Sequence, residues 1–243
     1  MKSQPFLLLA LFLTSNWAIA QRGRNAAETN QNQQAMTANE AQLKRDLDEL
    51  ATFKTKLAQF EAAFADKNTE KVAAVKNELT FAMQREIQQS EHKIAQDKKE
   101  VAQSQSETAA SKRETNRSRF DRATIDNDAK DAYDVRGDRR DRKDDQRDAM
   151  DDKNDLERQI ARTSRQKQIY ATLQDFTFSF EPSFQEKAAA NLALLQEFAS
   201  IMENDIAAIK AEMEEDKREA AEDRRERKED RWERAEKRRK RGW

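Results

Sequence analysis

The architecture of this chain can be predicted from residues 43–100, which read LKRDLDELATFKTKLAQFEAAFADKNTEKVAAVKNELTFAMQREIQQSEHKIAQDKKE. A similar stretch begins 120 residues later, where Ala51-Thr52 corresponds to Ala171-Thr172. With a shift of one residue, Asp97-Lys98-Lys99-Glu100 corresponds to Asp216-Lys217-Arg218-Glu219. We interpret the similarity as a degenerate tandem duplication of a helix–break–helix unit. The alternative is chance similarity between two charged helical segments.

The first copy has the apolar spacing of two amphipathic helices. Between residues 38 and 65 the apolar side chains recur mostly at steps of three, four or seven, with Phe53 at the margin of the stripe. Residues 66–69 then break the pattern, and Asn68 or Thr69 can cap a helix that starts near Glu70. Because the break is short, we expect the two helices to fold back as an antiparallel hairpin.

The second copy predicts another pair of helices, separated at Pro182. In the first of them we place Phe176 and Phe180 on the core face, which leaves Phe178 on the other side. The second helix has apolar side chains at heptad spacing, which is typical of coiled coils and bundles. They are Leu195, Phe198, Met202, Ile206, Ile209 and Met213. The two hairpins can pack together as a four-helix bundle, or their apolar faces can pair between chains.

The composition favours an all-α fold. Charged residues make up 38% of the chain, which has only three Gly and two Pro, so it is poor in the residues that turns between strands require. We therefore predict an all-α protein made of a duplicated antiparallel helical hairpin, as a four-helix bundle or coiled coil, with long charged helical extensions. The absence of Cys excludes disulfides, thiol nucleophiles and thiolate metal sites.

The predicted organisation follows these patterns along the chain. Residues 106–155 are rich in charge, and we expect charged helices flanking a loop near 133–138, where Gly137 supplies a turn; partial disorder is the alternative. The predicted segments are a signal peptide (1–20), a disordered leader (21–37), a first hairpin (38–105), a charged linker or arm (106–155), a second hairpin (156–213), and a charged single helix with a basic tail (214–243).

The N-terminal residues predict export. Lys2 supplies a positive charge, residues 6–13 are apolar, and Ala18-Ile19-Ala20 matches a signal-peptidase cleavage site before Gln21. The apolar run is too short to span a bilayer, which takes roughly 20 residues. We expect a mature chain that is periplasmic or secreted, from a Gram-negative bacterium.

The sequence offers little for catalysis. The single histidine, His92, has no second His or Cys to join it, and there are too few Gly for a phosphate-binding or dinucleotide-binding loop. Asp126-Asn127-Asp128 resembles half of a calcium loop, but Lys130 occupies a position that needs an oxygen ligand. We expect no catalytic residue, no cofactor, no metal site and no small-molecule substrate.

Two sets of residues are candidates for contacts with partners. Phe178 and Phe53 could contact a protein client if they are exposed, whereas burial of Phe178 between the hairpins would make it a core residue. Residues 217–241 hold 13 basic and 8 acidic side chains and could bind a polyanion such as a membrane surface or nucleic acid. The candidate contacts there are Lys237, Arg238, Arg239, Lys240 and Arg241.

These features predict a non-enzymatic helical protein that acts as a structural or protein-interaction scaffold, through contacts with protein partners or with itself. The first alternative is a periplasmic holdase-type chaperone, because a small helical core with charged arms is similar, in outline only, to periplasmic helical chaperones. The second alternative is a polyanion tether that acts through the basic C-terminal helix.

Overall fold

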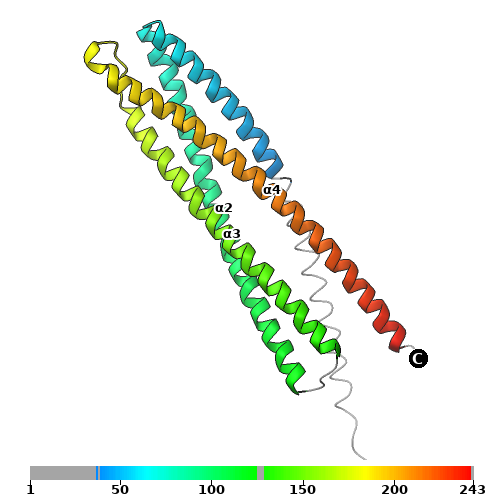
Figure 1. Ribbon diagram of the computed structural model, residues 1–243. Coiled ribbons are helices and arrows are strands. Elements are labelled where there is room, and N and C mark those ends of the chain that lie inside the picture. The colour runs from blue at the N-terminus through cyan, green and yellow to red at the C-terminus, as the bar shows by residue number, and fades with distance from the viewer. Residues whose placement is uncertain (1–36, 38, 125–128, 242–243) are drawn as a thin grey trace, which may run out of the picture. The chain divides into compact units, whose positions relative to one another are not determined.

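The computed structural model describes residues 37, 39–124 and 129–241, and all of its regular structure is helical. Residues 39–65 form the first helix. It is followed by α2 (Thr69–Thr124), α3 (Ala129–Gln174), a short 3-10 turn, η1 (Pro182–Phe184), and α4 (Gln185–Arg241) (Figure 1). The predicted all-α fold is therefore confirmed. The predicted signal peptide and the Asp126-Asn127-Asp128 motif lie outside the described residues.

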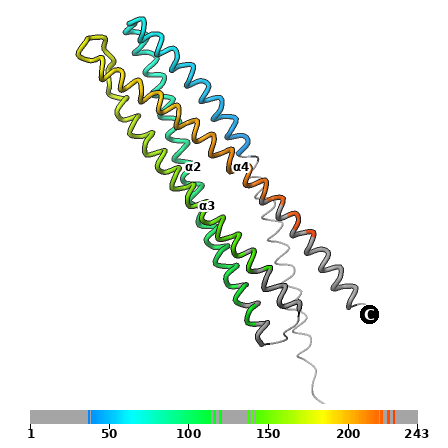
Figure 2. The backbone as a smooth tube through the Cα atoms, viewed as in Figure 1, coloured from blue at the N-terminus to red at the C-terminus, as the bar shows by residue number. Residues whose placement is uncertain are grey.

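The chain divides into two compact units. Unit 1 comprises Met1–Ala51 with Met202–Trp243, and unit 2 comprises Thr52–Ile201. The tube in Figure 2 shows the course of the described backbone through the helices. The long helix α4 contributes residues to both units, because the division between them falls after Ile201.

Unit 2 is a helical bundle with an aromatic and aliphatic core. In it, α2 and α3 lie side by side in antiparallel directions, since Lys76 of α2 meets the end of α3 while Ser104 meets Asp152 (Figure 1). Rings from residues 52–65 and from α4 pack together, with the centroids of Phe53 and Phe198 5.5 Å apart. The buried apolar side chains are Phe53, Leu57, Phe60, Ala63, Val72, Val75, Leu79, Met83, Ile87, Ile169, Leu173, Phe178, Ala188, Leu195, Phe198, Ala199 and Ile201.

The break between the first helix and α2 has the hydrogen bonds of a Schellman motif. The amide of Asn68 donates to the carbonyl of Ala63 at 2.9 Å, and the amide of Lys67 donates to the carbonyl of Phe64 at 3.1 Å. Lys67 takes the left-handed position with φ +54°, where Gly is usual. Asn68 then caps α2, because its Oδ1 accepts the amide of Lys71 at 3.0 Å. Of the two predicted caps, Asn68 is therefore the one that caps α2.

The connection between α3 and α4 differs from the prediction. α3 ends at Gln174, before the predicted helical residues Phe176 and Phe180. Lys76 of α2 donates to the Gln174 carbonyl at 2.7 Å, which satisfies one acceptor at the helix end. The Phe176–Phe180 segment is therefore not helical. Leaving the helix lets Phe178 turn its ring inward, which a helix continuing from α3 would not allow.

The charged middle of the chain also differs from the prediction. α2 continues to Thr124 and α3 starts at Ala129, so the connection lies between these residues and not near 133–138. Gly137 is a helical residue of α3 and does not form the predicted turn. It faces open space, since a Cβ added there would meet nothing within 4 Å.

The duplication itself is not confirmed. Each half of the chain contains a helix–break–helix, but the breaks do not coincide under the offset of 120 residues. Residues 66–68 correspond to 186–188, which lie within α4, and residues 175–184 correspond to 55–64, which lie within the first helix. The duplicated hairpin thus remains an interpretation of the sequence similarity.

Unit 1 pairs residues 39–51 with the part of α4 that begins at Met202. Asn39 Nδ2 donates to Asp216 Oδ2 at 3.3 Å, and among the described residues of this unit the buried apolar side chains come from α4. They are Met202, Ile206, Ile209 and Met213, which continue the heptad seam that the sequence predicts from Leu195 and Phe198. All six residues of that predicted seam are buried.

Candidate functional site

The most unusual feature of the described structure is the face that α3 turns toward α2. Near the end of α3 this face is apolar, with Ile169 and Leu173 fully buried. Toward the start of α3 the same spacing of three and four residues continues with polar groups. These are Gln166, Thr163 and Gln159, which are also buried, and then Asp155, Asp152, Asp148 and Asp145, which are partly buried. We call the part formed by residues 145–155 of α3 and residues 104–111 of α2 the carboxylate seam.

Hydroxyl groups of α2 meet the carboxylate seam. Ser104 Oγ donates to Asp152 Oδ2, and the Thr108 hydroxyl donates to the backbone carbonyl of Asp145 at 3.0 Å. The side chain of Ser111 also hydrogen-bonds the Asp145 carboxyl group. Small hydroxyl side chains let the two helices approach closely, and each of them can donate to a carboxylate oxygen.

The environment of the seam favours the protonated form of its acids. Burial, together with the neighbouring carboxylates of Asp145 and Asp144, raises the pKa of Asp148 to about 6. Burial also raises the pKa of Asp145 and that of Asp152 above the usual range, against the lowering effect of their hydrogen bonds to Ser111 and Ser104.

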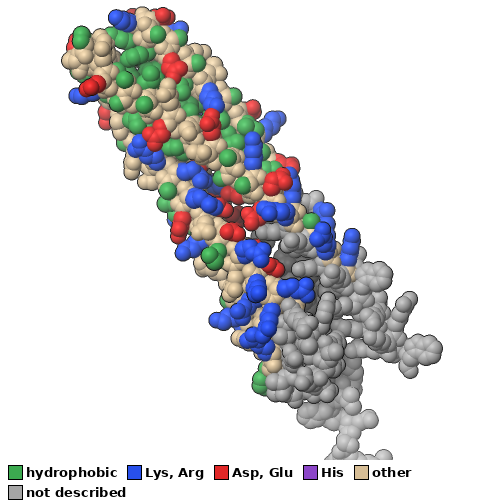
Figure 3. Space-filling model, in the orientation of Figure 1, with side chains coloured by type: hydrophobic (Ala, Val, Ile, Leu, Met, Phe, Trp, Pro, Cys, Tyr) green, Lys and Arg blue, Asp and Glu red, His purple; other side chains and the backbone are tan. Residues whose placement is uncertain are grey.

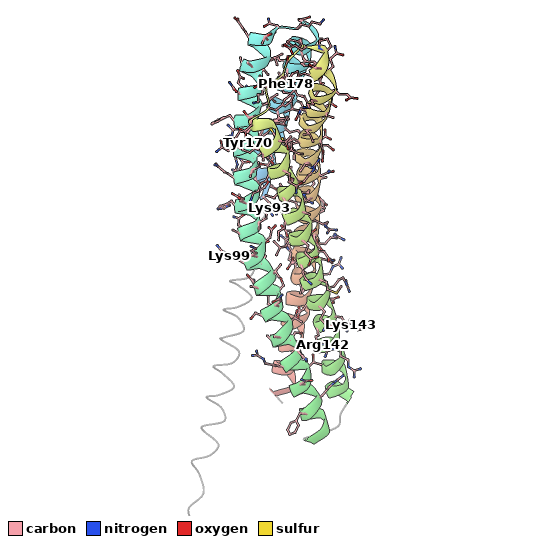
Figure 4. The ribbon with its side chains drawn as sticks, turned by 90° about the vertical axis from the view of Figure 1, so that its left-hand side faces the viewer. Lys93, Lys99, Arg142, Lys143, Tyr170 and Phe178 are labelled. Carbon is pink, nitrogen blue, oxygen red and sulfur yellow. The ribbon has the colours of Figure 1, made fainter. Side chains whose placement is uncertain are left out.

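A charged pair marks the boundary between this seam and the apolar core. Asp97 of α2 is 7% exposed, and its Oδ1 lies 3.2 Å from Lys93 Nζ. Burial raises the pKa of Asp97, while Lys93 and Arg162 lower it. The positions of Lys93 on α2 and of Arg142 and Lys143 near the start of α3 can be followed in Figure 4. Asp97 thus pairs with a cation on its own helix, whereas Asp152 and Asp145 meet hydroxyl groups of α2.

Unit 1 contains a second perturbed carboxyl group. Burial, followed by the nearby carboxylates of Glu49 and Asp205, raises the pKa of Asp46 to about 6 against the opposing effect of Arg45. Asp205, on α4, is 8% exposed. Both units therefore place acidic side chains at helix–helix contacts, where an apolar residue would be usual.

The two aromatic residues proposed as partner contacts are core residues. Phe53 is 1% exposed and Phe178 is 5% exposed, so the condition for a client contact at either residue is not met. Phe178 lies among the helices at the α3–α4 connection (Figure 4), with its ring centroid 4.8 Å from those of both Phe60 and Phe176. The burial alternative for Phe178 is the correct one, because the non-helical connection directs the ring into the core.

The basic C-terminal residues lie in the last turns of α4, which remains helical to Arg241. The side chains of Lys237, Arg238, Arg239, Lys240 and Arg241 lie outside the described residues, so polyanion binding there stays a prediction. Within the described residues, no group of three or more His, Asp or Glu side chains is arranged to hold a metal ion. None of the helices in the described ranges is long and apolar enough to cross a membrane.

The one sign of the carboxylate seam in the sequence is the regular spacing of its polar residues along α3. Residues 145, 148, 152, 155 and 159 follow a heptad pattern, but all five are polar, and polar residues on a charged helix predict a solvated arm. The apolar residues Leu156 and Ile160 lie at the edge of the contact, and Ile160 is 43% exposed. Comparisons with protein-family models, curated proteins and solved structures found no match to this chain.

Proposed function

We propose that this chain is an exported, non-enzymatic helical protein that acts as a structural or protein-interaction scaffold. The observation that supports this most is the antiparallel pairing of α2 and α3, which are 56 and 46 residues long. At 1.5 Å per residue, a 46-residue helix is about 69 Å long. A pair of helices of this length keeps partners bound at its two ends far apart, which is what a spacer does.

The surface of unit 2 favours contacts with other proteins. Positive and negative side chains are interspersed over the face shown in Figure 3, as is typical of solvated helices. The most exposed large apolar side chains in the described part of unit 2 interrupt this pattern: Phe81 and Phe120 on α2 are 65% and 67% exposed, and Met150 on α3 is 66% exposed. They are the positions at which we expect helix–helix contacts with a partner.

Site-specific photo-crosslinking in the cells that produce the protein tests the scaffold proposal. A benzophenone amino acid would replace Phe81, Phe120 or Met150 in turn, with the exposed polar residues Gln88 and Asn154 as matched control positions. A scaffold predicts a discrete crosslinked species from at least one apolar position and none from the controls. If apolar and control positions give the same products, or if none forms, the proposal is wrong.

The proposal of export rests on residues 1–20 and has its own test. Mass spectrometry of the N-terminal peptide from the producing cells should find a mature chain that starts at Gln21, in the periplasm or the medium. A cytoplasmic chain that retains Met1 would contradict export without affecting the scaffold proposal.

A holdase-type chaperone is the second candidate, and the same exposed side chains favour it. Because Phe53 and Phe178 are buried, we place the client contacts of a holdase at the most exposed apolar residues, Phe81, Phe120 and Met150. Light scattering of an unfolding test protein, with and without residues 21–243, separates the two functions. Suppression of aggregation near stoichiometry that is lost in Phe81→Ser with Phe120→Ser supports a holdase, whereas no suppression supports the scaffold.

A further inference from the structure

The carboxylate seam brings like charges together at a helix–helix contact. Asp145, Asp148 and Asp152 lie on successive turns of one face of α3, and residues three or four apart on a helix are roughly 5–6 Å from each other. Glu107 of α2 acts on both Asp145 and Asp152 across the contact. When all four groups are ionised, they repel one another both along α3 and between α2 and α3.

Cations offset this repulsion weakly. Among the strongest electrostatic influences on Asp145, Asp148 and Asp152 within the described residues, one is cationic, and that is Arg147 beside Asp148. Arg147 is itself exposed and paired with Asp144, whose Oδ1 lies 2.8 Å from its Nη2. The other charged influences on the three groups are the carboxylates of Glu107, Asp144, Asp151 and Asp155.

Protonation changes both the charge and the hydrogen bonding of this contact. A protonated carboxyl group removes the repulsion and gains an O–H donor, while its remaining oxygen still accepts from a hydroxyl group. The Ser104 and Ser111 hydroxyls already contact Asp152 and Asp145, so either can accept as well as donate there. The hydrogen bonds of Asp152 and Asp145 to these hydroxyls can therefore persist when the two acids carry their protons.

We propose that the carboxylate seam is an acid-operated clasp, in which α2 and α3 close against each other when Asp145, Asp148 and Asp152 take up protons and separate locally when these groups ionise. The apolar part of the α2–α3 contact, from Leu79 and Met83 to Ile169 and Leu173, stays packed in both states because these four side chains do not titrate. The clasp thus opens or closes only the end of the α2–α3 pair that contains the carboxylate seam, and the apolar core of the bundle is unchanged.

The direction and range of the response follow from the pKa values. The pKa of Asp148 is raised from 3.8 to about 6, and those of Asp145 and Asp152 are raised. A carboxyl group with a raised pKa in the closed state stabilises that state at low pH, and this contribution is lost as the pH rises from its usual pKa through the raised one. The clasp should be closed at about pH 5 and loosened at about pH 7.5.

Because the chain has no Cys, spin labels can be placed at chosen positions. We would label Gln105→Cys with Lys153→Cys to span the seam, and Gln88→Cys with Gln168→Cys to span the apolar part; all four residues are exposed. Electron–electron distance measurements should show a broader and longer distribution for the seam pair at about pH 7.5 than at about pH 5, with a midpoint near 6. The apolar pair should give the same distribution at both pH values.

Two variants complete the test. Asp145→Asn, Asp148→Asn and Asp152→Asn together should keep the seam distance short at both pH values. Asp46→Asn is the matched control, because it removes an equally perturbed carboxyl group from unit 1, and it should leave the response of the seam pair unchanged. The proposal is overturned if the seam distance does not depend on pH, if the triple variant keeps the response, or if Asp46→Asn abolishes it.

Discussion

Replacement of Phe178 by Ala distinguishes a core residue from a surface contact. The ring is 5% exposed and lies edge-to-face with Phe60 at 4.8 Å and with Phe64 at 5.8 Å. Truncation of a buried Phe to Ala costs about 3–5 kcal/mol, which includes the transfer of the side chain and the cavity left behind. The ring also holds the non-helical α3–α4 connection onto the bundle, so little relaxation can fill the cavity. We expect a loss of about 3 kcal/mol.

Urea denaturation followed by far-UV circular dichroism measures this loss. With a slope of roughly 2 kcal/mol per molar urea, the midpoint should fall by about 1.5 M. Phe81→Ala is the matched control, because the Phe81 ring is 65% exposed and its removal should change the free energy of unfolding by less than about 0.5 kcal/mol. If Phe178→Ala unfolds at the same urea concentration as the unmodified chain, Phe178 is not a core residue and the reasoning is wrong.

Three further predictions concern single features of the two units. Asp46→Asn should raise the free energy of unfolding at neutral pH by roughly 1 kcal/mol, because the unmodified chain loses stability between pH 3.8 and about 6 as Asp46 ionises. Urea denaturation at several pH values in this range should show that the free energy of unfolding of the variant depends less on pH. Lys67→Gly should stabilise the chain by about 0.5–1 kcal/mol in the same assay, since φ +54° suits Gly. A loss of stability would contradict the inference that the backbone of Lys67 is strained. Truncation after Met213 should abolish salt-sensitive binding to anionic vesicles if residues 217–241 act as a polyanion tether, and equal binding by the truncated chain would exclude that role.

Patterns that depend on local chemistry predict the structure well. The heptad from Leu195 to Met213 is buried throughout, and the break after Ala65 lies where Asn68 can cap the next helix. Both signals come from side chains a few residues apart, so they hold wherever the helix packs. The all-α fold follows in the same way from the scarcity of Gly and Pro.

Features that depend on tertiary contacts are predicted poorly. Gly137 indicates a turn in the sequence, but a single Gly costs a helix only about 1 kcal/mol, and the surrounding residues of α3 keep it helical. The helical stripe of Phe176 and Phe180 places Phe178 outside the core. Burying the Phe178 ring among Phe60, Phe64 and Phe176 instead ends the helix at Gln174.

The carboxylate seam escapes prediction for a related reason. An Asp on a helix is usually solvated, so the spacing of Asp145, Asp148 and Asp152 does not by itself indicate a helix contact. Their position depends on the register in which α2 meets α3, which places Ser104 opposite Asp152. That register is a property of the pair of helices and is not encoded within either one.

The register of α2 against α3 is the basis of both the spacer and the acid-operated clasp, and disulfide trapping measures it directly. Ser104→Cys with Asp152→Cys, oxidised by dipyridyl disulfide at about pH 5, should form an intramolecular disulfide rapidly, because these side chains are in contact. Ser104→Cys with Asp145→Cys should not, because seven residues displace the second position by about 10 Å along α3. Equal trapping of both pairs, or faster trapping of the second pair, would contradict the account.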